Sequence, residues 1–279
     1  MGTARERADV WRAFGWDWEV VVAEHWGDEH GAAVLLVHGF NGDPLDMAEL
    51  EEHLHARGFA TRNLLLPGHG THPRDLARTT WEDWSDAVMS AARELLDRYA
   101  CVILVGHSMG AALSLHVAAN EHRISGVAAL CPPLRMYAAE VRLAAIGHRV
   151  LPYLPTLRED ISDPEARVRY RQQRGHYRWT PIAAAHSLFT ALPALRIELH
   201  KVRCPAMVMA ARRDHVVPAR DGIEAYRLLG TPDKELHVLP RSYHVITKDV
   251  ERHVVFEHVG RFAERAAEAA ANVERERGA

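Results

Sequence analysis

Residues 101–110 read CVILVGHSMG, an apolar run that ends in the pattern Gly-x-Ser-x-Gly, and the helix-favouring stretch AALSLHVAA follows at 111–119. This order predicts a buried strand, a tight turn and a helix, with Ser108 at the turn. A serine at such a turn has strained backbone angles and close neighbours, so residues without side chains are needed at Gly106 and Gly110. The pattern therefore predicts that the Ser108 hydroxyl projects clear of a sheet, as a nucleophile must.

The pentapeptide alone carries little weight, because roughly one chain in ten of this length would contain it by chance. The plain alternative is a glycine-rich strand-to-helix turn that merely carries a serine. The Val/Ile/Leu strand before it and the small residues Ala111 and Ala112 after it favour the nucleophile.

Short apolar runs bounded by Gly and Pro recur along the chain, and stretches with a helical period separate them. This alternation is typical of βαβ units on a parallel sheet. The sequence therefore predicts an α/β fold with a mostly parallel central sheet flanked by helices. We expect strands at 32–37, 60–66, 101–105, 126–130, 206–210 and 235–239, and helices at 45–57, 81–99, 109–122, 221–229 and 251–273.

The strand pattern stops between Pro132 and Arg203, where helical segments interrupted by prolines take its place. We expect an inserted helical cap at 132–203, and a core formed by 1–131 and 204–279. The cap combines apolar residues with many arginines, which allows two interpretations. It is either a helical layer with a solvated basic face, or an apolar slot for an acyl chain with a basic mouth.

A serine hydroxyl needs a base within hydrogen-bond reach and an acid to orient that base. After a turn of this kind, the acid and then the base follow the serine along the chain. Asp214 follows the strand at 206–210, and His244 follows the strand at 235–239. Because the carboxyl ends of parallel strands meet at one crevice, we predict a triad of Ser108, Asp214 and His244.

Other residues compete for these roles. Asp221 and Asp233 are the alternatives to Asp214 as the acid. Among the 19 histidines, His38, His69 and His107 precede or adjoin the serine, which is the wrong order for the base. His215 adjoins the proposed acid, and adjacent side chains in an extended loop point apart. For His244 itself the alternative is a surface histidine in a polar loop.

The reaction also needs donors for the oxyanion that forms on the attacked carbonyl. One candidate is the backbone N–H of Met109, directly after the serine. The other is the N–H of Phe40, in the loop 37–42 after a strand. Gly39 and Gly42 could simply form a tight turn there. Such a turn would, however, also orient the Phe40 N–H toward the oxyanion.

Further motifs accompany the pentapeptide: HGFNG at 38–42, LPGHGT at 66–71, TW and DW at 80–84, CPA at 204–206, DHVVP at 214–218 and SYHV at 242–245. Through them the chain resembles the bacterial carboxylesterases and monoacylglycerol lipases of the α/β-hydrolase superfamily. The resemblance implies an α/β-hydrolase fold, the triad Ser108, Asp214 and His244, and an oxyanion hole at Phe40 and Met109. Ala111 stands where such proteins often have a second glycine, and the cap resembles the family only loosely.

These observations favour a serine hydrolase that cleaves carboxylic esters through an acyl-enzyme, of the carboxylesterase or monoacylglycerol lipase type. A thioesterase or a hydrolase of carbon–carbon bonds with the same triad is the alternative among enzymes, together with peracid chemistry. A non-catalytic ligand receptor on the same fold is the alternative from another class. An epoxide hydrolase or dehalogenase is disfavoured, because those enzymes need a carboxylate where Ser108 stands.

Composition limits the partners of the protein. The 279 residues carry a formal charge of −3 with both signs interspersed, which disfavours binding to nucleic acid or an anionic membrane. Cys101, Cys131 and Cys204 suggest neither a disulfide framework nor a zinc site. Residues 1–18 contain no apolar run of signal-peptide or membrane-span length. We therefore expect a cytoplasmic protein without integral membrane association, a monomer or homodimer, with a small acyl ester as its substrate and no metal or organic cofactor.

Overall fold

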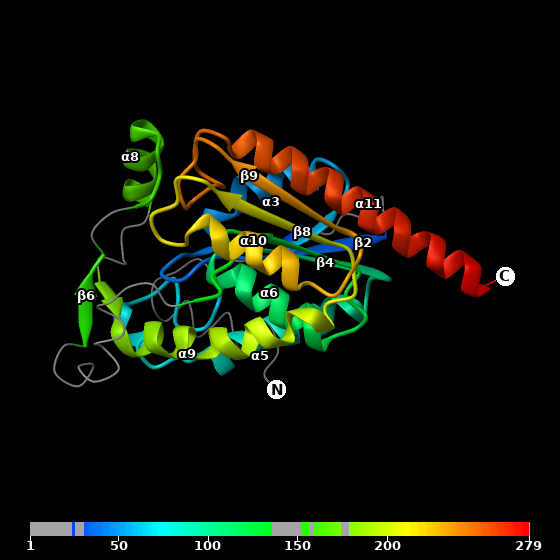
Figure 1. Cartoon of the computed structure of the whole chain (residues 1–279), viewed down its shortest axis with the longest axis horizontal. Helices are drawn as coiled ribbons and strands as arrows, with labels where there is room; N and C mark the ends of the chain where they lie inside the picture. The colour runs from blue at the N-terminus through cyan, green and yellow to red at the C-terminus, as the bar shows by residue number, and fades with distance from the viewer. Residues whose placement is uncertain (1–23, 26–30, 136–151, 157–158, 174–178, 279) are drawn as a thin grey trace.

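The computed structural model describes residues 24–25, 31–135, 152–156, 159–173 and 179–278 (Figure 1). Its centre is a seven-stranded sheet in the order β1-β3-β2-β4-β5-β8-β9. β1 pairs antiparallel with β3, and the other neighbouring strands of this sheet pair in parallel. The predicted mostly parallel sheet is confirmed. Its strands are β1 (Glu24–His25), β2 (Ala32–Val37), β3 (Ala60–Leu64), β4 (Cys101–His107), β5 (Gly126–Leu130), β8 (Ala206–Ala211) and β9 (Lys234–Leu239).

Helices follow most of these strands, close to the predicted positions. The predicted helix at 45–57 is divided into the 3₁₀ turn η1 (Pro44–Asp46) and the helix α3, because Pro44 begins a separate turn capped by the side chain of Asp43. The helices of the core are α3 (Ala48–His55), α4 (Pro73–Leu76), α5 (Trp81–Leu96), α6 (Met109–Asn120), α10 (Ala219–Leu228) and α11 (Arg252–Gly278).

Both faces of the sheet are covered, which explains why its central strands are apolar without alternation. On β2, residues 33, 35 and 37 pack with α5 and α6 in one buried cluster. Residues 32, 34 and 36 pack with α3 and α11 in a second cluster. Figure 1 shows the helices of the first cluster on one side of the sheet and α3 and α11 on the other.

The described part of the segment 132–203 contains two helices, α8 (Pro164–Gln173) and α9 (Ile182–Glu198), the latter followed by the short turn η2 (Leu199–Lys201). It also contains a small antiparallel sheet of β6 (Tyr153–Pro155) and β7 (Trp179–Pro181), so the described part is not wholly helical as expected. Proline supplies the reason, since it removes a backbone donor and favours extended backbone before it. The expected cap residues at 136–151 and the N-terminal stretch 1–18 lie outside the described residues.

The helix α9, together with η2, is long and apolar enough to cross a membrane by length and composition alone. Its side chains at positions 184, 188, 192 and 195 nevertheless belong to the same buried cluster as those of α5 and α6. We therefore interpret α9 as a helix that packs on the core.

The turn between β4 and α6 is packed too tightly for side chains. A Cβ atom on Gly106 would lie 2.1 Å from the carbonyl oxygen of Gly110. A Cβ atom on Gly110 would lie 2.1 Å from the carbonyl oxygen of Val37, at the end of β2. The two glycines thus allow the first turn of α6 to rest directly on the sheet edge.

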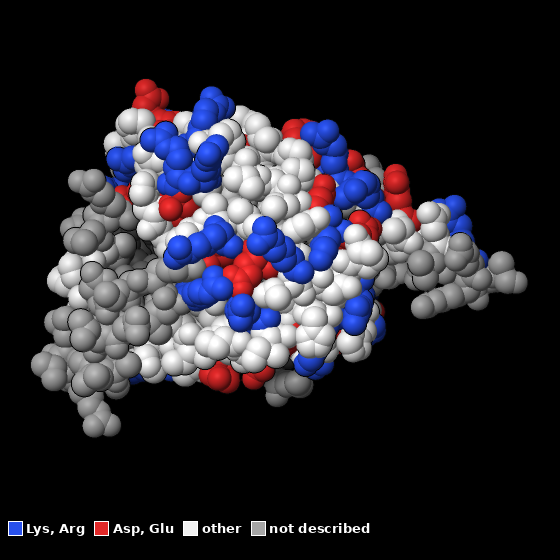
Figure 2. Space-filling model, viewed as in Figure 1, with Lys and Arg blue, Asp and Glu red and all other residues white. Residues whose placement is uncertain are grey.

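Charges of both signs are mixed on the face of the molecule in Figure 2, where an acidic group lies among arginines over α10. Glu224 of α10 forms ion pairs with Arg135 and Arg196 there. Basic side chains cover more of this face than acidic ones, but the two signs lie close together.

We expect Gly106→Ala to lower the free energy of unfolding by about 3 kcal/mol or more, because the new methyl group meets backbone that cannot move aside. The control is Gly126→Ala in β5, where a Cβ would lie 3.1 Å from the Ala266 side chain and neighbours can adjust. It should cost about 1 kcal/mol or less. Urea unfolding measures both, and equal losses would contradict the explanation.

Candidate active site

Ser108 lies at the turn between β4 and α6 with an unusual backbone conformation, φ 54° and ψ −118°. A positive φ is strained for a residue with a side chain, and here the close packing of Gly106 and Gly110 maintains it. The Ser108 N–H donates to the carbonyl oxygen of Leu130 at 2.8 Å, which ties the turn to the end of β5. The serine is therefore held rigidly at the carboxyl edge of the sheet, as predicted from the sequence.

His244 lies in the loop after β9 and points toward Ser108. Its Nε2 is 2.9 Å from the Ser108 Oγ, and its Nδ1 is 2.7 Å from Asp214 Oδ2. A carboxylate only accepts, so Nδ1 carries a proton and donates to Asp214. In the neutral ring Nε2 then accepts from the serine hydroxyl. The three predicted residues form one hydrogen-bonded row.

Asp214 lies in the turn after β8, with its side chain fully buried. Its Oδ1 also accepts from the backbone N–H groups of Val216 (2.8 Å) and Val217 (2.7 Å). Burial by itself would raise the pKa of Asp214, but nearby His244 and these hydrogen bonds hold that pKa below its usual value. The carboxylate consequently stays ionised beside the histidine at neutral pH.

The competing residues are placed elsewhere. Asp221 accepts the N–H of Leu134 at 2.8 Å and lies near Arg135. Asp233 precedes β9 and so belongs to the opposite edge of the sheet. His38 accepts the N–H of Leu66 at 3.1 Å. The His244 ring meets Asp214.

The two predicted oxyanion donors lie next to Ser108. Met109 is the first residue of α6, where a backbone N–H has no acceptor within the helix. In the loop after β2, a Cβ on Gly39 would lie 3.3 Å from the Cβ of Ser108. The following residue, Phe40, contacts the rings of His69 and Trp84 edge-on. That the amides of Phe40 and Met109 bind an oxyanion stays a prediction.

His107 is buried next to the loop that carries His244. Its Nε2 donates to the carbonyl oxygen of His244 at 2.9 Å, and the two ring centroids are 5.0 Å apart. Burial, and to a lesser extent the neighbouring His244, lowers the pKa of His107 to about 4. His107 is therefore a neutral support for the main chain of His244, a role that its chain position beside the serine did not reveal.

Cys131 is a second residue whose role the sequence did not reveal. It directly follows β5 and lies beneath Asp214, with an αL-region φ of 51°. Burial, followed by the charge of Asp214 and a hydrogen bond to it, raises the pKa of the Cys131 thiol well above its usual value. The thiol thus stays protonated and donates to the carboxylate. All three cysteines are free.

Among the described residues, one group of side chains that could hold a metal ion lies in this site. Cys131, Asp214 and His244 offer ligand atoms within 4.8 Å of one another. However, Asp214 and His244 are already hydrogen-bonded to each other, and Cys131 is a protonated thiol, whereas metal ligands of these types are deprotonated. The site suits proton transfer better than metal binding, and the absence of a metal cofactor stays a prediction.

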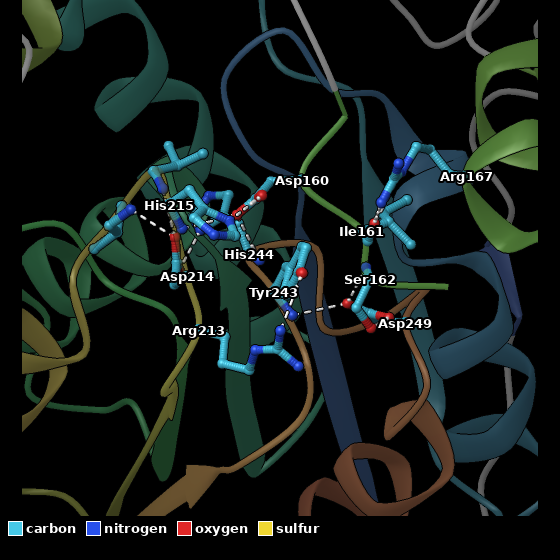
Figure 3. A network of polar contacts seen from close by, with 12 residues as sticks. Asp160, Ile161, Ser162, Arg167, Arg213, Asp214, His215, Tyr243, His244 and Asp249 are labelled. Carbon is cyan, nitrogen blue, oxygen red and sulfur yellow. Dashed lines mark hydrogen bonds and ion pairs between the residues drawn. The ribbon is translucent and has the colours of Figure 1, made fainter. Parts of the chain in front are cut away.

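The segment 132–203 contacts this site at two points. Asn41, which follows Phe40, donates from Nδ2 to Thr180 Oγ1 at 2.8 Å. Asp160 accepts the backbone N–H of His244 at 3.1 Å and also contacts His215 (Figure 3). Sequence reasoning assigned Asp160 no role at this site, because a contact between residues 84 positions apart leaves no local pattern.

We expect the stability of the protein to fall as the pH decreases from about 6.5 to about 4, partly because of His107. Its ring stays neutral in the folded protein in that range but takes up a proton when unfolded, so acid favours unfolding by on the order of 3 kcal/mol in total. His107→Gln keeps an amide donor without a titrating ring and should flatten this dependence. Urea unfolding between pH 7 and pH 4.5 measures it, and parallel curves for both proteins would contradict the assignment.

Comparison with known proteins identifies relatives of the chain. Residues 28–251 match the family model described as serine aminopeptidase, S33. A thermostable monoacylglycerol lipase from Bacillus sp. (strain H-257) is 31% identical over 237 residues, covering 84% of this chain and 92% of the relative. A carboxylesterase from Bacillus subtilis (strain 168) is 29% identical over 235 residues, covering 84% and 92%.

Solved structures give the same result. A structure reported with LipS and LipT, two metagenome-derived lipolytic enzymes, superposes with a TM-score of 0.81 at 31% identity, covering 88% of this chain and 97% of that chain. The Paleococcus ferrophilus monoacylglycerol lipase has the same fold, with a TM-score of 0.76 at 21% identity, covering 88% and 98%. The resemblance stated from the motifs is confirmed, and the chain belongs to the serine aminopeptidase S33 family of α/β-hydrolases.

Proposed function

We propose that this chain is a serine hydrolase that cleaves carboxylic esters, with Ser108 as nucleophile, His244 as base and Asp214 as acid. The hydrogen-bonded row from Asp214 through His244 to Ser108 carries the proposal. The names of the curated relatives, a monoacylglycerol lipase and a carboxylesterase, support ester hydrolysis. The family description names a peptidase, so the choice of an ester rests on those relatives.

In the proposed reaction, Ser108 Oγ bonds to the ester carbonyl carbon while its proton passes to His244 Nε2. The carbonyl electron pair moves onto oxygen, and the N–H groups of Phe40 and Met109 stabilise the negative charge. When the carbonyl re-forms, the bond to the alcohol breaks and the alcohol takes the proton from His244. Water then releases the acid from Ser108 by the same steps.

Asp214 has an electrostatic role in this scheme. It keeps the His244 ring in the tautomer that leaves Nε2 free to accept a proton, and it stabilises the imidazolium that forms. Its lowered pKa suits this role, because the carboxylate keeps its charge through the cycle. Cys131 and the N–H groups of Val216 and Val217 hold the carboxylate in place.

We propose esters with small to medium acyl chains, including monoacylglycerols, as substrates, in line with the names of the relatives. We further propose that 132–203 forms a cap over a core of 1–131 and 204–279. The protein would be a cytoplasmic monomer or homodimer without integral membrane association.

Replacing the nucleophile should abolish the activity. We expect Ser108→Ala and His244→Ala to lower kcat/KM for p-nitrophenyl butyrate by about 10⁴-fold or more, since members of such a triad act as one unit. Ser114→Ala is the matched control, because Ser114 lies buried further along α6 and its hydroxyl has no hydrogen-bond partner. Its activity should stay within about twofold. Wild-type hydrolysis by Ser108→Ala would rule out the proposed nucleophile.

The same variants separate an enzyme from a ligand receptor on this fold. A fluorophosphonate probe should label the wild-type protein and Ser114→Ala, but not Ser108→Ala, and labelling of His244→Ala should be strongly slowed. A folded wild-type protein that resists the probe yet binds acyl ligands tightly would instead indicate a receptor.

A substrate panel tests the type of bond. We expect kcat/KM to be highest for p-nitrophenyl esters and monoacylglycerols, and lower for acyl-CoA thioesters and for diketones whose carbon–carbon bond would be cleaved. The reason is that the names of the relatives, a monoacylglycerol lipase and a carboxylesterase, indicate a site that fits the transition state of ester hydrolysis. A preference for acyl-CoA or a diketone under equal conditions would overturn the choice of an ester.

A further inference from the structure

Carboxylates bind successive backbone amides of the loop that carries His244. We call residues 240–249 the histidine loop. Glu251 Oε2 accepts the N–H groups of Arg241 (2.9 Å) and Ser242 (2.7 Å), and Asp249 Oδ2 accepts that of Tyr243 (2.8 Å). Irregular backbone has no ladder partners, so these side chains satisfy its amides. These hydrogen bonds fix the position of the main chain just before His244.

The next amide in the series, that of His244, is bound from the cap. Asp160 Oδ2 accepts the His244 N–H at 3.1 Å, and the carbonyl oxygen of Asp160 accepts the N–H of Val245 at 3.0 Å. The Asp160 side chain is 14% exposed, so water competes little for it. Figure 3 shows Asp160 directly beside the His244 main chain.

Asp160 also binds the loop that carries Asp214, the proposed acid. Its Oδ2 accepts the N–H of His215 at 2.9 Å, and its Oδ1 lies 2.7 Å from Nδ1 of the same residue. Because His215 directly follows Asp214, one carboxylate oxygen bridges the main chains of the proposed acid and the proposed base. Residues 214 and 244 belong to different loops. The bridge through Asp160 therefore constrains the position of one loop relative to the other.

The segment around Asp160 is itself anchored. We call residues 159–163 the cap strap. Asp249 accepts the N–H (2.8 Å) and the hydroxyl (2.5 Å) of Ser162, while Arg167 of α8 donates to the carbonyl oxygen of Ile161. Ile161 is completely buried in a cluster with Val245. The strap is thus fixed directly after Asp160.

From these contacts we infer that Asp160 is a positioning residue, which holds the main chain of His244 so that its ring bridges Asp214 and Ser108. This inference rests on the proposed triad. The His244 carbonyl oxygen is bound by His107, its N–H by Asp160 and its Nδ1 by Asp214. Without the Asp160 oxygens, the His244 N–H loses this acceptor. The groups that would touch the substrate stay in place.

The test compares three variants by kcat, KM and the rate of fluorophosphonate labelling at Ser108. Asp160→Ala should lower kcat and the labelling rate about 10- to 100-fold, with KM within about threefold, because small displacements of a catalytic group cost that much. Asp160→Asn keeps an amide oxygen that can accept both N–H groups, so it should stay within about fivefold of the wild type. Arg169→Ala removes an exposed ion pair with Glu165 on α8, away from the strap, and should stay within about threefold.

Unfolding in urea shows whether a variant is folded. If Asp160→Ala does not fold, Asp160→Leu has nearly the same shape without acceptor oxygens and should show the same loss. The inference is overturned if the Ala or Leu variant keeps wild-type kcat, if Asp160→Asn is as slow as Asp160→Ala, or if Arg169→Ala is equally slow. An active Ser108→Ala variant would instead reject the triad itself, so the two failures are distinguishable.

Discussion

The close contact of α6 with the sheet edge is the constraint on which the site depends. Gly110 rests on the carbonyl oxygen of Val37, and Gly106 rests on that of Gly110, so no side chain fits between helix and sheet. This packing holds Ser108 at a positive φ. It also aligns the first amides of α6 with the loop after β2, where Gly39 lies against Ser108. The proposed nucleophile and the two proposed oxyanion donors are thus placed together by one packing contact.

Much of this arrangement follows from local sequence. Strands buried on both faces are continuously apolar, so β2, β4, β5 and β8 were readily predicted. Because parallel strands end at a common edge, the order of the motifs was enough to predict that Asp214 and His244 lie beside Ser108. The observed distances of 2.7 and 2.9 Å agree with that geometric argument.

The residues that sequence reasoning missed act through contacts between distant segments. Cys131 looks like an ordinary buried cysteine, and only the tertiary structure brings its thiol to Asp214. Asp160 looks like one acid among the charges of the cap, and its partner His244 is 84 residues away. The sheet of β6 and β7 has strands of three residues each, too short for any periodic pattern. Such features depend on how segments meet, which local composition does not encode.

Segment 132–203, the proposed cap, consequently forms hydrogen bonds with the loops that carry the proposed catalytic residues. Thr180 of β7 binds Asn41 beside Phe40, and Asp160 binds the main chain of His244. The segment that would select the substrate therefore also supports the loop that carries Phe40 and the proposed base, His244. Since the ester specificity of such a site is set by the transition state it fits, a change in the cap would alter rate and selectivity together. Exchanging caps between relatives would then require the residues at both anchoring points to be kept.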